Sequence, residues 1–206
     1  AREVGLPTVD AATEAAAGAF VEVRGLNDAG GRSGVALAVR SDLSIGEQVA
    51  ARGATWLDRQ LIARDPVALG DAGFGAEVRD ALARRQAHLV EQGIARQDGD
   101  RTLYPRGMLA TLQRQELDDL VSRLERETGL AHSPAVAGEY VTGTYRRRFA
   151  LAAGRMAMID DGLQFQLVPR PPSLEKQRGR HVSGVGRDDG GVDWSFGRKR
   201  DMGIGL

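Results

Sequence analysis

Cysteine is absent from the 206 residues of this chain, and several patterns that mark whole classes of protein are absent with it. A chain without cysteine forms no disulfide and no thiolate metal site, which fits a reducing compartment such as the cytoplasm. No apolar run approaches the ~18 residues of a membrane-spanning helix, and the first residues do not form a basic and then apolar leader. We therefore expect a cytoplasmic protein without membrane contact. Because the chain begins at Ala1, we also expect it to be a piece of a longer polypeptide.

Recognisable catalytic and cofactor-binding motifs are missing as well. The sequence contains no GxSxG, GxxxxGK[ST] or GxGxxG motif. His88, His132 and His181 are isolated, without the HxH or HExxH spacing of a zinc site. Paired carboxylates at Asp160-Asp161 and Asp188-Asp189 could bind a metal or act as acid and base, but each pair precedes a glycine, where aspartate favours a hairpin turn. We expect no catalytic residue, no metal and no cofactor.

Charge is balanced over the whole chain but differs between its parts. The 28 Lys+Arg residues equal the 28 Asp+Glu residues in number. Residues 1–133 hold 16 basic against 20 acidic residues, a net charge of −4, whereas residues 134–206 hold 12 against 8, a net charge of +4. The basic third is therefore where a polyanion would bind. The chain has two lysines, Lys176 and Lys199; arginine suits bidentate phosphate contacts, although a GC-rich genome produces the same excess.

Residues 1–42 are predicted to form an N-terminal arm and a β-hairpin. The first twenty residues are rich in alanine and can bury little apolar surface. Two alternating apolar runs follow, at 20–23 and 35–39, with a connection rich in Asn, Asp, Gly and Ser between them. Such a pattern is typical of a hairpin.

Residues 43–133 are predicted to form a helical, winged-helix-like module. Capping-box spacing at Ser44–Glu47 and Thr55–Asp58 indicates two short helices, the second ending at Asp65-Pro66. A helix over 75–92 would bury Val78, Leu82 and Leu89, and the segment IARQ, the turn DGD and RTLYP would add a two-stranded wing. A longer helix is predicted from Met108 to Thr128, with Gly129 as its stop.

Four arginines of this module are candidate contacts to DNA phosphates: Arg79, Arg84, Arg96 and Arg101. The acidic residues Asp80 and Glu91 share the outer face of the predicted helix with Arg84, which is unusual for a helix in the major groove. A structural or protein-binding wing is therefore the alternative interpretation.

Residues 134–206 are predicted to form a small basic β-barrel of about five strands with a C-terminal tail, so that the whole chain is α+β. Val141, Tyr145, Phe149 and Leu151 would lie on one side of the first strand. Two hairpins follow: RMAMI with LQFQLVP, in which Leu163, Phe165 and Leu167 alternate with glutamines, and HVSGVGR with VDWSFGR, which places Trp194 and Phe196 inside.

Most candidate nucleic-acid contacts lie around these strands, where a small barrel with a basic rim would hold a phosphate backbone. A solubilising rim is the alternative interpretation. The candidates are Arg146, Arg147, Arg148, Arg178, Arg180 and Arg187, together with the tail residues Arg198, Lys199 and Arg200; Lys176 belongs to the same surface.

Three stretches carry a family resemblance: GATWLDRQL, DAGFGAEVRDALARRQAHLVEQGIAR, and the final run from GEYVTGTYRRRFALAAGRMAMIDDGLQFQLVP to HVSGVGRDDGGVDWSFGRKR. Over residues 43–203 the sequence resembles the uncharacterised C-terminal domain that follows the nuclease domain in bacterial relaxase and mobilisation proteins. Arg170 stands where relatives tend to have an aromatic residue after the LVP proline.

The resemblance implies a setting in conjugative DNA transfer, in which the upstream domain of a relaxase nicks one DNA strand with a tyrosine and a histidine-rich metal site. Tyr104, Tyr140 and Tyr145 have no histidine partners in sequence and should not inherit that role. We therefore expect a non-enzymatic accessory region of a relaxase-like protein that contacts single- or double-stranded DNA. The alternative is a protein-interaction module, or a recognition module for type IV secretion machinery, that does not bind DNA directly.

Overall fold

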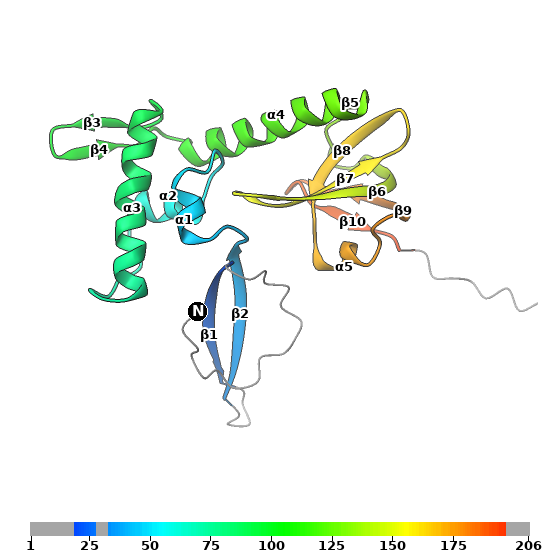
Figure 1. Cartoon of the computed structure of the whole chain (residues 1–206). Helices are drawn as coiled ribbons and strands as arrows, with labels where there is room; N and C mark the ends of the chain where they lie inside the picture. The colour runs from blue at the N-terminus through cyan, green and yellow to red at the C-terminus, as the bar shows by residue number, and fades with distance from the viewer. Residues whose placement is uncertain (1–18, 28–32, 197–206) are drawn as a thin grey trace, which may run out of the picture. The chain divides into compact units, whose positions relative to one another are not determined.

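The computed structural model describes residues 19–27 and 33–196, and it confirms the α+β class (Figure 1). These residues belong to two compact units. The first runs to Leu117 and includes Leu151–Gly154, and the second comprises Asp118–Ala150 and begins again at Arg155. The boundary therefore falls inside the helix α4, Met108–Thr128, which has the bounds predicted from the sequence.

The first unit contains the predicted hairpin, formed by β1 (Phe20–Asn27) and β2 (Ser33–Ser41). The strands are antiparallel, with Val21 opposite Val39 and Asn27 opposite Ser33. The ring of Phe20 lies 4.4 Å from that of Trp56 and 6.0 Å from that of Phe74, measured between centroids. These aromatic contacts attach the start of the hairpin to the helices of its own unit.

Both predicted capping boxes are present, so α1 (Ile45–Val49) and α2 (Trp56–Leu61) begin where the sequence indicates. In the second box the Thr55 hydroxyl accepts from the amide of Asp58 at 3.2 Å, and the Asp58 carboxylate accepts from the amide of Thr55 at 2.7 Å. The end of α2 differs from the prediction. It closes at Leu61 rather than at Asp65-Pro66, because the backbone already leaves helical geometry at Ile62.

The helix α3 (Phe74–Glu91) and the hairpin β3 (Arg96–Asp98) with β4 (Arg101–Leu103) also form as predicted. Gln86 joins them, since its amide donates to the Thr102 hydroxyl at 2.7 Å and accepts from the Tyr104 hydroxyl at 3.3 Å. The described residues thus form a helix followed by a two-stranded hairpin. They do not show a complete winged helix.

The side chain of Arg85, on the buried side of α3, is fully enclosed and uses all five of its N–H donors. Two hydrogen bonds of 2.8 Å go to the carboxylate of Asp58, which is also fully buried. The other three, of 2.5 to 3.1 Å, go to backbone carbonyls at the end of α1 and in the loop that follows it, at Val49, Ala51 and Gly53. One side chain therefore ties α1, α2 and α3 together.

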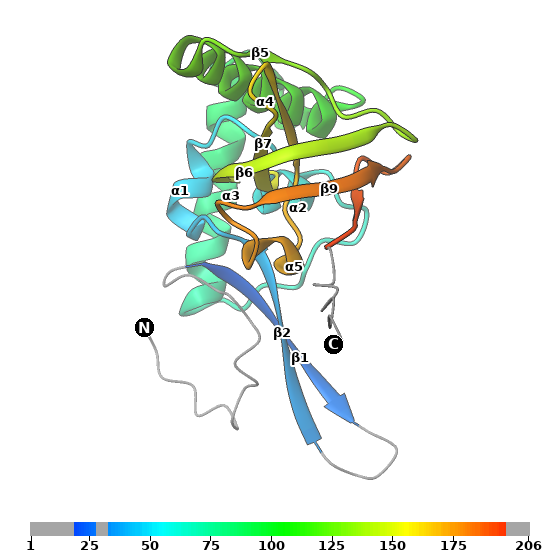
Figure 2. The same ribbon diagram turned by 90° about the vertical axis from the view of Figure 1, so that its right-hand side faces the viewer.

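The second unit is built on a sheet that the structure describes as six-stranded, in the order β10-β9-β6-β7-β8-β5. Its strands are β5 (Ala131–His132), β6 (Tyr140–Leu151), β7 (Gly154–Asp160), β8 (Gln164–Pro169), β9 (His181–Gly186) and β10 (Val192–Trp194). β5 runs parallel to β8, whereas β9 runs antiparallel to both β6 and β10. In Figure 2 β6 and β9 lie side by side.

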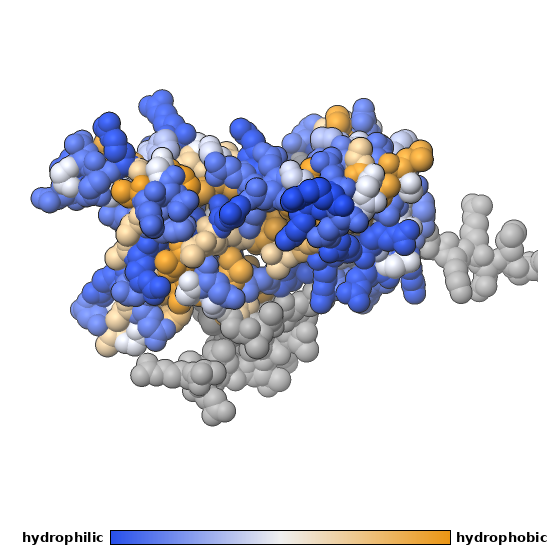
Figure 3. Space-filling model, turned by 45° about the horizontal axis from the view of Figure 1, so that its top comes forward, coloured by the Kyte–Doolittle hydropathy of each residue, from blue (hydrophilic) through white to orange (hydrophobic). Residues whose placement is uncertain are grey.

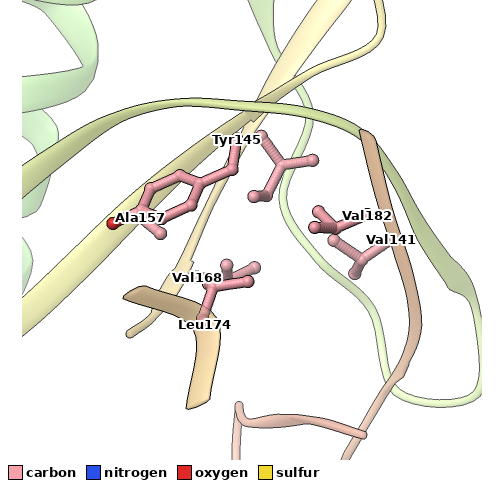
Figure 4. Close-up of a cluster of buried hydrophobic side chains, with 7 residues drawn as sticks. Val141, Tyr145, Ala157, Val168, Leu174 and Val182 are labelled. Atoms are coloured by element: carbon pink, nitrogen blue, oxygen red, sulfur yellow. The ribbon is translucent and has the colours of Figure 1, made fainter. Parts of the chain in front are cut away.

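The predicted barrel is not supported, because the sheet is open, with β10 and β5 at opposite edges. Instead, a helix covers each face of the sheet. Packing a helix on a sheet removes apolar surface from water, so the sheet need not close into a barrel to bury it. On one face, Leu174 of α5 (Pro172–Glu175) packs with Val141, Tyr145, Ala157, Val168 and Val182 (Figure 4). The short helix α5 was not predicted from the sequence.

Along the other face runs the part of α4 that belongs to this unit. Its Glu127 accepts from Arg147 of β6 at 2.7 Å, and its Glu125 accepts from the backbone amide of His132 in β5 at 3.1 Å. The α4 side chains Leu120 and Leu124 are buried there. So are the strand residues Met158, Phe165 and Leu167.

Two predicted inner-face residues are exposed. Leu163 is 85% exposed, because β8 begins only at Gln164 and Leu163 belongs to the turn before it. Phe196 is 36% exposed, since β10 ends at Trp194, whose own ring packs against the core as expected.

Replacing Arg85 with methionine should lower the free energy of unfolding of the first unit by about 3–5 kcal/mol, because the buried Asp58 carboxylate would lose its counter-charge. Urea unfolding measures the change. The matched control is Arg84→Met, which removes an exposed cation that lies 3.8 Å from Asp80; a loss below about 1 kcal/mol is expected there. Equal losses in the two variants would contradict a structural role for Arg85.

Candidate nucleic-acid interface

The run Arg146-Arg147-Arg148 on β6 is exposed, but each guanidinium already holds a carboxylate. Arg146 bonds Asp160 at the end of β7 at 3.1 Å, Arg147 bonds Glu127 of α4 at 2.7 Å, and Arg148 bonds Glu175 of α5 at 2.7 Å. The guanidinium of Arg147 also lies over the ring of Phe149, 5.5 Å from its centroid. A phosphate would have to compete with these carboxylates, so the run is a weaker anion site than its sequence suggests.

Glu175 forms a second centre of charge, because it accepts from both Arg148 and Arg170. The hydroxyl of Tyr145 lies 3.5 Å from the same carboxylate. Partial burial would raise the pKa of Glu175, but the positive charges of Arg170 and Arg148 outweigh it and hold this pKa below its ordinary value. Burial raises the pKa of the Tyr145 hydroxyl, and the neighbouring Glu175 carboxylate adds to that effect. The cluster fixes α5 against β6.

Lys176, Arg178 and Arg180 differ from these arginines, and we call the stretch 176–180 the basic segment. All three side chains are exposed, and none forms an ion pair with any residue that the structure describes. Two backbone hydrogen bonds fix the segment to β6: the amide of Gly179 donates to the carbonyl of Tyr145 at 2.8 Å, and the amide of Tyr145 donates to the carbonyl of Arg180 at 3.0 Å. The basic segment therefore presents positive charge from an anchored backbone.

Arg187 is compensated by the β9–β10 turn, since it bonds the carboxylates of Asp189 and Asp193. The turn interpretation of the acidic doublets is confirmed by their hydrogen bonds. Asp161 accepts from the amides of Leu163 and Gln164, both at 2.8 Å, which lowers its pKa. Asp189 accepts from the amide of Gly191 at 2.9 Å. These carboxylates therefore serve the backbone, as turn aspartates do.

The candidate arginines of the first unit lie apart from one another along α3 and the wing. Arg84 is 3.8 Å from Asp80, one turn earlier on α3. Arg96 and Arg101, on β3 and β4, are exposed and form no ion pair with a described residue. The remaining candidates Arg198, Lys199 and Arg200 lie outside the described residues.

Sequence reasoning missed two sets of residues. Arg85 was overlooked although it lies seven residues after Val78 and four before Leu89, on the apolar side of α3. The second set is the row of polar side chains on β6 and β9. The alternation placed Thr142 and Thr144 opposite the apolar side of the strand, but neither they nor Ser183 were named as candidate contacts. The alternation itself was the available signal.

The surface drawn on the right-hand side of Figure 3, over the sheet, is mainly hydrophilic. An open pocket of about 560 Å³ is lined by Ala137, Gly138, Gly186 and the turn residues Arg187, Asp188 and Asp189. Within residues 19–27 and 33–196, no group of three or more His, Cys, Asp or Glu side chains is arranged to hold a metal ion. No helix in that part of the chain is long and apolar enough to cross a bilayer.

Comparison with protein-family models gives a match over residues 16–203 to a family described as a protein of unknown function, DUF3363. The chain belongs to this family. Searches of curated proteins and of solved structures found no match. The matched residues extend over both compact units, and the family description assigns no activity.

The Glu175 cluster gives a prediction for pH dependence. Because the folded-state pKa of Glu175 is held below 4.5, its ion pairs contribute stability that is present above pH 4.5 and lost as the pH falls through the lowered pKa. An NMR titration of the Glu175 side-chain carboxyl carbon should show a midpoint below 4.5, moving upward in an Arg148→Gln variant. A midpoint at or above 4.5 in the unaltered protein would show that burial outweighs the two arginines.

Proposed function

We propose that this DUF3363 chain is a non-catalytic accessory region that contacts DNA through the basic segment, in the setting of a relaxase-like mobilisation protein. The observation that carries the proposal is the trio Lys176, Arg178 and Arg180. Three exposed cations within five residues, with no carboxylate partner among the described residues, are available to phosphate oxygens at no cost in broken ion pairs.

Further support comes from the distribution of charge. The excess of positive charge lies in residues 134–206, and the ion pairs of the second unit neutralise much of it around Arg146, Arg147, Arg148 and Arg187. Among the described residues of 134–196, the cations without a carboxylate partner are Lys176, Arg178 and Arg180 of the basic segment. The transfer setting rests on the sequence resemblance to the C-terminal domain of relaxases, and a helix followed by a wing in the first unit is compatible with a second DNA contact through Arg96 and Arg101.

A second candidate function is docking on transfer or secretion machinery without direct DNA contact. It is favoured by the same ion pairs, because six of the candidate arginines already have acidic partners and need no phosphate. In this case the basic C-terminal tail would be the signal that the machinery recognises. Removal of residues 197–206 would then abolish translocation of the protein in a cell-based transfer assay and leave DNA affinity unchanged.

Replacing Lys176, Arg178 and Arg180 with glutamine should weaken DNA binding. The plot of the logarithm of the binding constant against the logarithm of salt concentration should become less steep by about 2–3, since each phosphate contact contributes roughly 0.7–0.9 to the steepness. Fluorescence anisotropy at two salt concentrations, with single- and double-stranded DNA, measures both quantities.

The matched control is Arg114→Gln/Arg123→Gln/Arg126→Gln, which removes the same number of positive charges from exposed arginines of α4 that are not candidate DNA contacts. Its slope should change little. No binding by the unaltered protein at low salt would refute DNA contact, and equal effects of the two triple variants would refute the role of the basic segment.

A further inference from the structure

One part of the sheet in the second unit is uncovered, where β6 and β9 pair. Three cross-strand pairs lie there in register: Tyr140 with Val185, Thr142 with Ser183, and Thr144 with His181. Side chains directly opposite each other on antiparallel strands point to the same face, so the six form one continuous row. We call this row the hydroxyl face, because four of its six members carry a hydroxyl group.

The hydroxyl face lies opposite the apolar core. The residues that alternate with it on the two strands, Val141, Gly143, Tyr145, Val182 and Gly184, are buried. In contrast Tyr140 is 74% exposed, and Thr142, His181 and Val185 are exposed as well. Thr144 and Ser183 of the same row are half-buried. The two strands lie in the foreground of Figure 2.

Positive charge lies at one end of the hydroxyl face. Arg180 directly precedes His181, the first residue of β9, and its carbonyl accepts from the amide of Tyr145 in β6. The hydrogen bonding between β6 and β9 therefore continues into the basic segment. Arg146 follows at the same end of β6. Three acidic side chains lie near the row. Glu139 directly precedes Tyr140 and is exposed, Asp160 of β7 holds Arg146 at 3.1 Å, and Asp193 of β10, opposite Val185, accepts from Arg187 at 3.4 Å. The row therefore combines an exposed aromatic ring, hydroxyl groups and neighbouring cations.

These three kinds of group match the chemistry of an unpaired nucleic-acid strand. Aromatic rings stack on bases that are free of a duplex, and cations and hydroxyls hold the phosphate backbone beside them. Double-stranded DNA offers the same phosphates, but its bases are already stacked on one another and cannot lie on Tyr140. An open sheet surface with one exposed ring thus favours a single strand.

We propose that the hydroxyl face is a platform for single-stranded DNA, with Tyr140 stacking on a base and the basic segment binding the phosphates that follow. This inference rests on the proposed DNA contact and adds to it the form of the DNA and the residue that selects it. The occupant is chosen by charge complementarity, because uncompensated cations border the row at the end formed by Thr144 and His181.

The test is a set of anisotropy titrations of the whole chain with a labelled oligothymidine of about 16 nucleotides, a length that spans the usual site of a single-strand platform, and with a duplex of equal length. Tyr140→Ala should weaken binding of the single strand about 5- to 150-fold and change duplex binding little, because one base loses its stacking partner. Tyr140→Phe should keep the affinity, since the ring stays. Val67→Ala, which trims another exposed apolar side chain, is the control and should have no effect.

The outcomes separate this inference from the proposed function. Single-strand binding that depends on Tyr140 and is kept by phenylalanine supports the platform. DNA binding that is lost with the basic segment but unaffected by Tyr140→Ala overturns the platform and leaves the proposed DNA contact standing, as does tighter binding of the duplex. Failure of the unaltered protein to bind either DNA at low salt overturns both.

Discussion

The first unit depends on one guanidinium that is removed from water. Arg85 and Asp58 are both fully buried, and the remaining donors of Arg85 satisfy three carbonyls at the end of α1 and in the loop that follows it. This segment has no strand neighbour to bond, so without Arg85 its carbonyls would be buried without partners. A buried ion pair adds little net stability over a well-packed apolar pair, but a broken one is costly. The network therefore fixes how α1, α2 and α3 pack rather than how strongly they do so.

The same network shows how far local sequence signals reach. Features that depend on residues close together in the sequence were predictable. They are the capping boxes at Ser44 and Thr55, the bounds of α4, and both pairs of strands joined at glycine turns. The partners of Arg85 lie 27 to 36 residues away. Its position on the apolar side of the helix indicated burial, but which carboxylate and which carbonyls surround it follows from packing alone.

The sheet of the second unit illustrates the same limit at the level of a domain. Alternation predicts strands and their faces, and it is identical in a closed barrel and in an open sheet covered by helices. The difference lies in α5, a single turn of four residues, and in α4, whose Glu125 and Glu127 reach β5 and β6. The positions of Arg146, Arg147 and Arg148 were predictable for the same reason. Their acidic partners come from three different elements, β7, α4 and α5, and were not predictable.

This pairing decides which positive charge of the unit can act on a ligand. Net charge counts every arginine alike, but a guanidinium that already holds a carboxylate must exchange one partner for another, and the gain is small. Lys176, Arg178 and Arg180 avoid that exchange. Because two backbone hydrogen bonds fix their segment to β6, less conformational freedom is lost on binding than a free basic tail would lose. Their place beside the exposed row of Tyr140 and Thr144, where neither helix covers the sheet, makes this the part of the fold at which charge and open surface coincide.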